Sequence, residues 1–248
     1  MAEPRYGIER FLNVRTAGGA AFSPDGSRVS FISNISGIAQ VWSVDVQGGW
    51  PEQLTFYEDR VAFAQYSPVD DQLVFGMDEG GNERLHLYLL SGDGSLVQPL
   101  TDEPDVIHTW GGWSPDGRHV AFASNSRDRA YFDVYVQNVD TGDRRRVYQA
   151  DGGHSVAGWS PDGRHVIVAR SYGSSSNDLY LVEGESGQVQ HLTPHDGDAQ
   201  YANVRWRRDG SGFYLVSDEG REYLGLAFYD LERRTLDWLE TPEWDIEP

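Results

Sequence analysis

The stretches WSPDGRHVAF at residues 113–122 and WSPDGRHVIV at residues 159–168 decide the fold, because they are two copies of one pattern. In each copy an aromatic residue enters a tight polar turn, and an apolar run follows. The repeats counted from Pro24 to Pro68, Pro115, Pro161 and Arg208 are 44, 47, 46 and 47 residues long. A period of about 40 to 50 residues built from short strands is typical of propeller blades, whereas helical arrays need long 3.6-residue periodicity. The five turns read Phe22-Ser23-Pro24-Asp25-Gly26, Tyr66-Ser67-Pro68-Val69-Asp70, Trp113-Ser114-Pro115-Asp116-Gly117, Trp159-Ser160-Pro161-Asp162-Gly163 and Trp206-Arg207-Arg208-Asp209-Gly210.

The chemistry of this turn explains why the same residues recur. Proline presets φ for the second position of a type I turn, aspartate is favourable within it, and glycine takes the left-handed position that follows. The turn therefore predicts a bulged hairpin, and its flanks predict four strands in every repeat. The predicted fold class is all-β, a propeller of five four-stranded antiparallel blades. The expected strands are residues 19–23, 28–33, 40–46 and 52–55 in the first repeat, and residues 111–114, 119–124, 133–138 and 145–148 in the third.

The domain organisation follows from the repeats. The first strand of each repeat carries small residues ahead of its aromatic residue, which suits the innermost strand of a blade. The aromatic side chains are expected to wedge between neighbouring blades, each burying about 150 to 250 Å². Ile8, Phe11 and Leu12 could belong to a short helix or to a lead-in strand. The expected segments are a lead-in at 1–16, blades at 17–55, 56–101, 102–150, 151–193 and 194–241, and the start of a further segment at 242–248.

Composition excludes several classes of function. The 248 residues carry a formal net charge of −19, which repels nucleic acid and disfavours binding to anionic membranes. The chain has no cysteine, so it has no disulfide framework. No apolar run has the length of a secretory signal or a membrane span, and we therefore expect a cytoplasmic location.

A search for catalytic chemistry finds no complete motif. The nearest approach to a nucleophile elbow is Gly153-His154-Ser155-Val156-Ala157, which lacks the closing glycine and leads into a strand. His119 and His165 occupy one repeat position and are expected on strand surfaces. His191 and His195 are four residues apart, but Pro194 separates them, so no helix can place them on one face. We therefore expect no catalytic residue, metal site or cofactor in this chain.

Three features together resemble the N-terminal propeller of prolyl oligopeptidase family serine peptidases. They are the repeated turn, the lead-in YGIERFL at residues 6–12 and the segment DEGGNERLHLY at residues 78–88. The acylaminoacyl-peptidase and dipeptidyl-peptidase branch gives the best match, and the resemblance covers nearly the whole chain. Tol-system propellers and other WD-type propellers share the turn alone. In the peptidase family the propeller precedes an α/β-hydrolase domain, which carries the catalytic residues, and it screens the peptides that reach them.

The resemblance implies that this chain is one part of such an enzyme. The sequence lacks the hydrolase domain, and family propellers have seven or eight blades where five are visible here. We therefore expect the chain alone not to be an enzyme, and its parent, if longer, to be a serine peptidase. An incomplete ring is expected to expose apolar blade faces through which the chain could self-associate, including Phe31, Trp42, Phe213, Tyr214 and Phe228. Closure into a five-bladed ring is the other possibility.

Blade topology indicates where a peptide or protein partner would bind. In a four-stranded meander the Pro-Asp-Gly turns share one face, and the longer loops after the second strands share the other. Binding sites are usually built on variable loops carried by a rigid scaffold. The carboxylates there are expected to attract an amino terminus or basic side chains, and the arginines a carboxylate. A stand-alone propeller that binds a protein or peptide remains the alternative function. The candidate residues are Asp78, Glu79, Asn82, Glu83, Arg127, Arg129, Asp218, Glu219 and Glu222.

Overall fold

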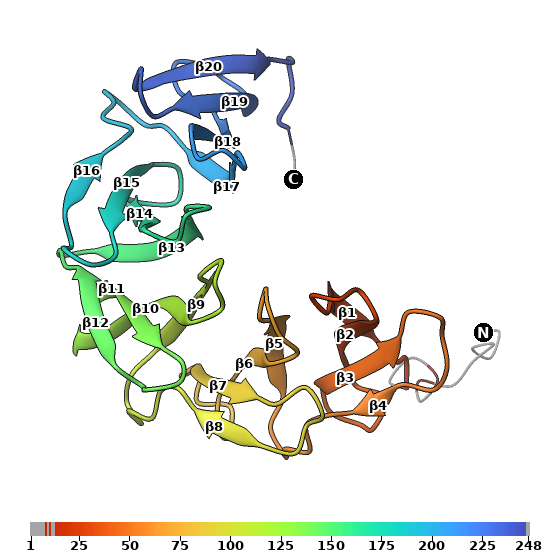
Figure 1. Cartoon of the computed structure of the whole chain (residues 1–248). Coiled ribbons are helices and arrows are strands. Elements are labelled where there is room, and N and C mark those ends of the chain that lie inside the picture. Colours follow the sequence, from red (N-terminus) through yellow and green to blue (C-terminus); the bar gives the residue numbers. More distant parts are fainter. Residues whose placement is uncertain (1–7, 9, 11–12, 247–248) are drawn as a thin grey trace. The chain divides into compact units, whose positions relative to one another are not determined.

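The structure, a computed structural model, describes residue 8, residue 10 and residues 13–246. About 49% of these residues lie in strands, well above the 20–25% average of globular proteins. The twenty strands of the described chain form five antiparallel sheets of four consecutive strands each (Figure 1). The predicted all-β class and the five four-stranded blades are therefore confirmed. Most of the expected lead-in, and the last two residues of the chain, lie outside the described residues.

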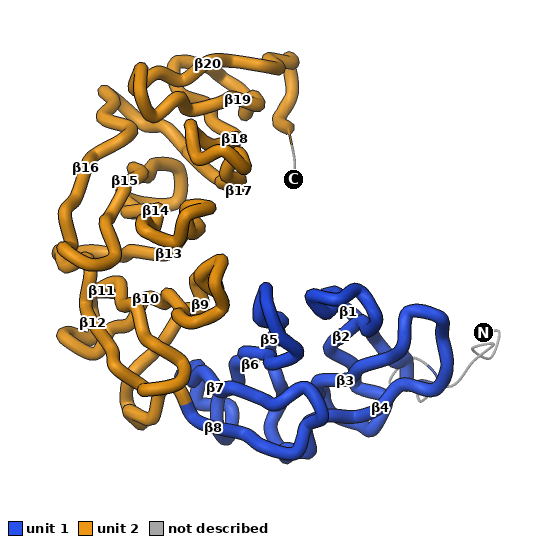
Figure 2. The backbone as a smooth tube through the Cα atoms, in the orientation of Figure 1, with its two compact units in different colours: residues 1–99 blue, residues 100–248 orange. Residues whose placement is uncertain are grey.

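The chain divides into two compact units, residues 1–99 and residues 100–248 (Figure 2). The first unit contains two blades, which share a core around Val41, Leu73 and Phe75. No helix in the described part of the chain is long and apolar enough to cross a membrane. The strands of the first unit are β1 (Ala17–Phe22), β2 (Arg28–Ser33), β3 (Gln40–Asp45) and β4 (Glu52–Gln53), followed by β5 (Val61–Tyr66), β6 (Leu73–Met77), β7 (His86–Leu90) and β8 (Val97–Pro99).

The second unit contains three blades. One core cluster, with Val134 and Val168, lies between its first two blades, and a second cluster, with Ile167 and Phe213, lies between its last two. Its first blade consists of β9 (His108–Trp113), β10 (His119–Asp128), β11 (Tyr131–Asn138) and β12 (Arg144–Tyr148). Its other blades consist of β13 (Gly153–Trp159), β14 (His165–Ser171), β15 (Asn177–Glu183) and β16 (Val189–His191), and of β17 (Tyr201–Trp206), β18 (Gly212–Ser217), β19 (Gly225–Asp230) and β20 (Thr235–Glu240).

Two of the turn aromatics, Tyr66 and Trp159, contact the preceding blade, as predicted. The Tyr66 hydroxyl lies 3.5 Å from Ser43 Oγ of the preceding blade. The indole Nε1 of Trp159 donates a hydrogen bond of 3.1 Å to the carbonyl oxygen of Gly112 in the preceding blade. The prediction is wrong for Phe22, which is 69% exposed. Phe22 belongs to the first strand of the described chain, so no earlier sheet of that chain can cover it.

Two of the aromatic residues expected on exposed blade faces are buried instead. Trp42 is 6% exposed, and its Nε1 donates to the carbonyl oxygen of Ser33 in its own blade. Phe213 is fully buried and stacks on Tyr229 with ring centroids 5.2 Å apart. Tyr214 is 39% exposed, in line with the prediction. Phe213 and Tyr214 are neighbours on β18, and neighbouring residues of a strand point to opposite faces of the sheet, which explains why only Tyr214 is exposed.

The expected strands 119–124 and 133–138 leave residues 125–132 as a loop, and this is also wrong, because most of these residues lie in strands. β10 continues to Asp128 and β11 begins at Tyr131, with Asp128 paired to Tyr131. Cross-strand contacts hold this polar hairpin, including one of 3.0 Å between the hydroxyl oxygens of Ser126 and Tyr135. The Ala130 N–H donates to Asp128 Oδ1 and closes the tip. The hairpin therefore places Arg127 on strand β10 instead of in a loop.

A shared set of hydrogen bonds forms the Pro-Asp-Gly turns. In the third blade, Ser114 Oγ donates to Asp116 Oδ1 at 2.6 Å, and the Arg118 N–H donates to the same oxygen at 3.1 Å. The His119 N–H donates to Ser114 Oγ, and Gly117 has φ 68°, the left-handed region that favours glycine. The turns at Asp25 and Asp162 repeat this pattern. Below, the end of a blade that carries these turns is its turn end, and the opposite end is its loop end.

Candidate functional site

The predicted residues of the second blade lie on the loop that joins β6 to β7. Glu79, Asn82 and Glu83 are exposed, and Asp78 is half-buried. The loop folds on itself, because Asp78 Oδ2 accepts the Glu83 N–H and Asn82 Oδ1 accepts the Arg84 N–H. Glu83 has φ 59°, an uncommon conformation for a residue with a Cβ. The loop therefore presents two exposed glutamates on an ordered backbone.

Arg127 and Arg129 have different surroundings in the third blade. The Arg127 guanidinium donates to both carboxylate oxygens of the fully buried Asp133, from Nε at 2.7 Å and from Nη2 at 3.1 Å. It also donates to the carbonyl oxygen of Ala150. The Asp133 carboxylate raises the pKa of Arg127 further above its usual range. Arg129 is exposed and lies 3.7 Å from Asp105, so it is the more accessible cation of the two.

The predicted residues of the fifth blade lie between β18 and β19. Asp218 Oδ1 accepts the Gln200 N–H at 2.6 Å, which ties this loop to the segment that enters the blade. Glu219 is half-buried, and Glu222 is exposed. Burial and the nearby Glu219 carboxylate raise the pKa of Tyr201. The structure thus places the nine predicted residues on loop ends of separate blades, and their role in peptide binding stays a prediction.

A buried polar residue lies at the start of the third strand in four blades, as Gln40, His86, Asp133 and Asp178, and sequence reasoning missed it. We call three of these residues the linker anchors: Gln40, Asp133 and Asp178, which are 1%, 0% and 5% exposed. Gln40 donates to the carbonyl oxygens of Tyr57 and Asp59 and accepts the Tyr57 N–H, all in the linker to the next blade. Gln40 and Asp178 therefore fasten the third strand of their own blades to the chain that follows. Asp133 does so through Arg127, whose guanidinium also reaches the carbonyl oxygen of Ala150.

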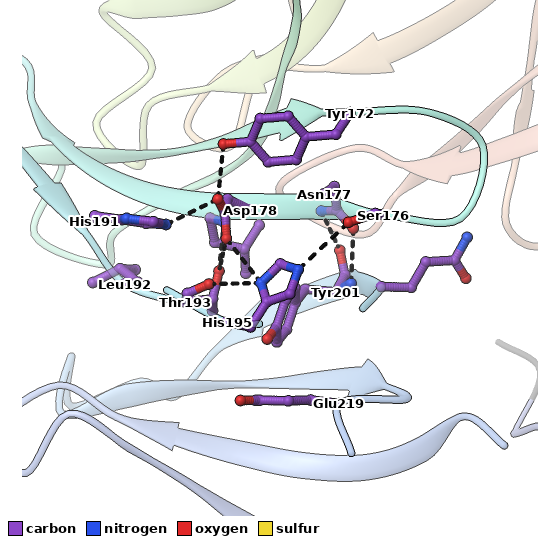
Figure 3. Close-up of polar contacts among 12 residues, drawn as sticks. Tyr172, Ser176, Asn177, Asp178, His191, Leu192, Thr193, His195, Tyr201 and Glu219 are labelled. Carbon is purple, nitrogen blue, oxygen red and sulfur yellow. Dashed lines mark hydrogen bonds and ion pairs between the residues drawn. The ribbon is translucent and has the colours of Figure 1, made fainter. Parts of the chain in front are cut away.

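The anchor of the fourth blade, Asp178, collects polar side chains from four directions (Figure 3). Its Oδ2 accepts a hydrogen bond of 2.8 Å from the Tyr172 hydroxyl and lies 3.0 Å from His191 Nε2. Its Oδ1 lies 3.3 Å from Thr193 Oγ1 and 3.1 Å from His195 Nδ1. Burial would raise the pKa of Asp178, but the hydrogen bonds from His191 and Tyr172 outweigh it and lower the pKa below its usual range.

The surroundings of His195 fix which ring nitrogen carries its proton. Nδ1 lies 3.0 Å from the carbonyl oxygen of Thr193 and 3.1 Å from Asp178 Oδ1, and both of these atoms can only accept. Nδ1 therefore carries the hydrogen, and in the neutral ring Nε2 is an acceptor. Nε2 lies 3.4 Å from Ser176 Oγ, as Figure 3 shows. The imidazole thus links the buried carboxylate to a serine hydroxyl.

A cavity of about 350 Å³ lies beside this cluster, between the fourth and fifth blades. Its wall includes Ser155, Ser176, Asn177 and Tyr201. Asn177 holds the two blades together, because its Nδ2 donates to the carbonyl oxygen of Tyr201 and its Oδ1 accepts the Tyr201 N–H. Ser155 lies on β13 and lines the cavity. Among the described residues, no histidine forms a hydrogen bond with its hydroxyl. The cavity opens among loop-end residues of both blades.

The histidines dismissed from the sequence are thus brought together by the sheet. His191 Nε2 lies 3.0 Å from Asp178 Oδ2, and His195 Nδ1 lies 3.1 Å from Asp178 Oδ1. Both distances suit hydrogen bonds to the carboxylate. Among the described residues, no group of three histidine, aspartate or glutamate side chains is arranged to hold a metal ion. The repeated polar residue at the start of the third strand was the available sequence signal, because an apolar residue, Val41, Val134 or Leu179, follows it in each blade.

Comparison with known proteins supports the resemblance identified from the sequence. Dipeptidyl aminopeptidase BIII of Pseudoxanthomonas mexicana is 26% identical over 225 residues, which cover 86% of this chain and 32% of the relative. A solved prolyl endopeptidase aligns with a TM-score of 0.74 at 14% identity, covering 92% of this chain and 37% of the other. TolB from Acinetobacter baumannii aligns with a TM-score of 0.63 at 18% identity, covering 93% and 55%.

These matches confirm the fold and the kind of propeller. The chain spans only about a third of the curated peptidase relative that it matches. The two structural alignments show a shared propeller fold across nearly the whole chain. The model of the TolB beta propeller domain, PD40, matches residues 77–223, which is more than half of the sequence. The chain therefore belongs to the TolB beta propeller domain family.

Proposed function

We propose that this chain is the propeller portion of a prolyl oligopeptidase-like serine peptidase and screens the peptides that reach a separate catalytic domain. The observation that carries the proposal is the similarity to dipeptidyl aminopeptidase BIII, which extends over 86% of the chain but only 32% of the relative. A propeller that accounts for a third of a peptidase leaves the chemistry to the remaining part. The screening role rests on the resemblance described above.

The charge at the loop end supports a preference for cationic peptides. Glu79 and Glu83 are exposed on the ordered loop of the second blade, and Glu222 is exposed in the fifth. The whole chain carries a net charge of −19, so its field attracts cations over distances up to the Debye length. A peptide with a free amino terminus and a basic side chain is the matching ligand.

Charge reversal on the second blade tests this preference. The variant E79K/E83K should weaken binding of a fluorescein-labelled tetrapeptide with a free amino terminus and one arginine by about two- to fivefold at low salt, because exposed pairs contribute modestly. Fluorescence anisotropy measures the affinity. The matched control is E185K, an exposed glutamate on the turn between β15 and β16 at the turn end. Two equalities together would exclude a peptide-screening role for this loop. The wild type and the double variant would bind the peptide with equal affinity, and the wild type would bind the N-acetylated peptide as tightly as the free one.

A stand-alone propeller that binds a protein or peptide is the second candidate. The alignment with TolB favours it, because this chain covers 55% of that protein, a larger share than of the peptidases. The coding sequence downstream of Pro248 separates the two candidates. A Gly-x-Ser-x-Gly elbow between a predicted strand and a predicted helix supports the peptidase, and an in-frame stop supports the stand-alone propeller.

A further inference from the structure

We propose that Ser176 is an activated nucleophile, with His195 as its general base and Asp178 as the residue that positions His195. The three side chains form a continuous series at the edge of the cavity between the fourth and fifth blades (Figure 3). Ser176 Oγ lies 3.4 Å from His195 Nε2, and His195 Nδ1 lies 3.1 Å from Asp178 Oδ1. Hydroxyl, imidazole and carboxylate in this order are the groups by which serine hydrolases activate their nucleophile.

The protonation state of His195 suits this role. Its Nδ1 faces only acceptors, so the lone pair of the neutral ring lies on Nε2, next to the serine hydroxyl. Asp178 is held by Tyr172, His191 and Thr193 in addition, which fixes the carboxylate that orients the imidazole. The distance of 3.4 Å is long for a hydrogen bond, and such contacts tighten when a substrate is bound.

Structural needs explain Asp178 but leave the serine contact unexplained. In the first blade the corresponding anchor, Gln40, fastens the linker by contacts with backbone atoms of Tyr57 and Asp59. In the third blade Asp133 is satisfied by Arg127. The fourth blade differs from these two. There the linker residue beside the anchor is His195, and its Nε2 contacts the hydroxyl of Ser176, which lines the cavity.

The reaction that follows is acyl transfer to Ser176. The Oγ–H proton passes to His195 Nε2 while Oγ bonds to the carbonyl carbon of an ester. The ester C–O bond then breaks, and the leaving alcohol takes the proton from Nε2. Water repeats the sequence on the acyl-serine, again through His195, and releases the acid.

The size of the cavity sets the substrate class. About 350 Å³ is near the lower limit of small-molecule sites. It therefore suits an activated ester of a short, uncharged acyl chain better than an extended peptide. This activity is separate from the proposed peptide screening, which belongs to the exposed loops and to another domain.

Covalent labelling of the purified full chain tests the proposal. A fluorophosphonate probe should modify Ser176, forming a P–O bond as fluoride leaves. The chain contains no lysine, so trypsin releases residues 171–205 as one peptide, and fragmentation of that peptide locates the adduct. The labelling rate should depend on pH, because general-base catalysis requires the base in its unprotonated form. Release of nitrophenol from p-nitrophenyl acetate should follow the same profile.

Variants separate an activated serine from an incidental contact. Ser176→Ala should abolish labelling, and His195→Gln should slow it by about 100-fold, the usual contribution of a general base. Asp178→Asn should change the pH profile as well as the rate. Ser174→Ala is the matched control, because Ser174 lines the same cavity and should leave the rate unchanged. Circular dichroism shows whether each variant is folded. Absence of an adduct on the folded wild type, or an equal rate for folded His195→Gln, would refute the proposal.

Discussion

At the scale of single residues, the pairing of Arg127 with the buried carboxylate of Asp133 changes the role expected for this arginine. Arg127 was a candidate for holding a peptide carboxylate, yet its guanidinium is occupied by a carboxylate of the same blade. A fully buried carboxylate is tolerated only when it is paired and hydrogen-bonded. The first duty of Arg127 is therefore to stabilise the fold.

Replacement of Arg127 should test this duty directly. Arg127→Met leaves the buried Asp133 carboxylate with only the more distant Arg146, at 3.5 Å, and should lower the melting temperature by at least about 5 °C. Arg129→Met is the control, because Arg129 is exposed and only loosely paired, and it should leave the melting temperature nearly unchanged. Differential scanning calorimetry measures both. Equal melting temperatures for the two variants would contradict a structural role for Arg127.

The turn aspartates predict a response to acid. Hydrogen bonds from Ser23 and Ser27 lower the pKa of Asp25 from 3.8 to about 2. Because this folded-state pKa is below the unfolded one, the carboxylate stabilises the native state above about pH 4, and the contribution is lost as the pH falls toward 2. Ser23→Ala should return the pKa of Asp25 toward 3.8. Carboxyl titration by NMR measures it, with the similar turn at Asp93, whose pKa is also about 2, as the internal reference.

At the scale of elements, the innermost strands explain why small residues precede the turn aromatics. A Cβ built on Gly111 would lie 2.4 Å from Val156 Cβ of the next blade and 2.7 Å from the carbonyl oxygen of Ala121. The same construction on Gly18 meets no atom within 4 Å. Close contacts with both the next blade and its own blade therefore require glycine at Gly111, and no such contact exists at Gly18.

This pair of glycines gives a matched test of blade packing. Gly111→Ala should reduce the free energy of unfolding by about 1–3 kcal/mol, because the packed interface must move to admit a methyl group. Gly18→Ala should change it by less than about 0.5 kcal/mol, since the site is open. Urea denaturation followed by circular dichroism gives both values. A larger loss for Gly18→Ala would show that the inner strands are not packed as described.

The sequence predicted the elements well where repetition carried the information. The period and the turns located all five sheets, because each turn contains its own hydrogen-bond pattern and needs no distant partner. The hairpin of β10 and β11 was missed because Asn125, Ser126 and Arg127 are polar, and the pairing of Asp128 with Tyr131 is visible only in the folded sheet. The Asp178 cluster was missed for the same reason. His191 reaches Asp178 through the pairing of β15 with β16, and chain spacing alone does not reveal that pairing.

At the scale of the whole molecule, charge is the dominant property. The chain has 39 acidic residues against 20 basic ones, and all 20 are arginines. Such an excess of one sign destabilises a compact state by self-repulsion and keeps the protein soluble. Arginine is also the cation suited to buried and bidentate pairs, as with Asp133.

Salt should therefore stabilise this protein. Raising sodium chloride from 20 to 300 mM should increase the melting temperature by several degrees, because the shorter Debye length screens repulsion between carboxylates. Differential scanning fluorimetry measures the shift. A variant with six exposed acidic residues changed to amides should show a smaller increase. A decrease of the melting temperature with salt would mean that ion pairs outweigh the net repulsion.

The linker anchors suggest how such a chain acquires new chemistry by duplication. Three of the five described blades carry such a buried polar group, which contacts the following linker directly in Gln40 and Asp178 and through Arg127 in Asp133. Drift in one copy can then exchange the partners without rebuilding the group, as the arginines around Asp133 and the histidines around Asp178 illustrate. One substitution in the linker, giving a histidine such as His195, and one in the facing loop, giving a serine such as Ser176, would turn a structural hydrogen bond into a serine–histidine pair. Repetition thus supplies several blades with a similar starting point for a site, and divergence determines which blade uses it.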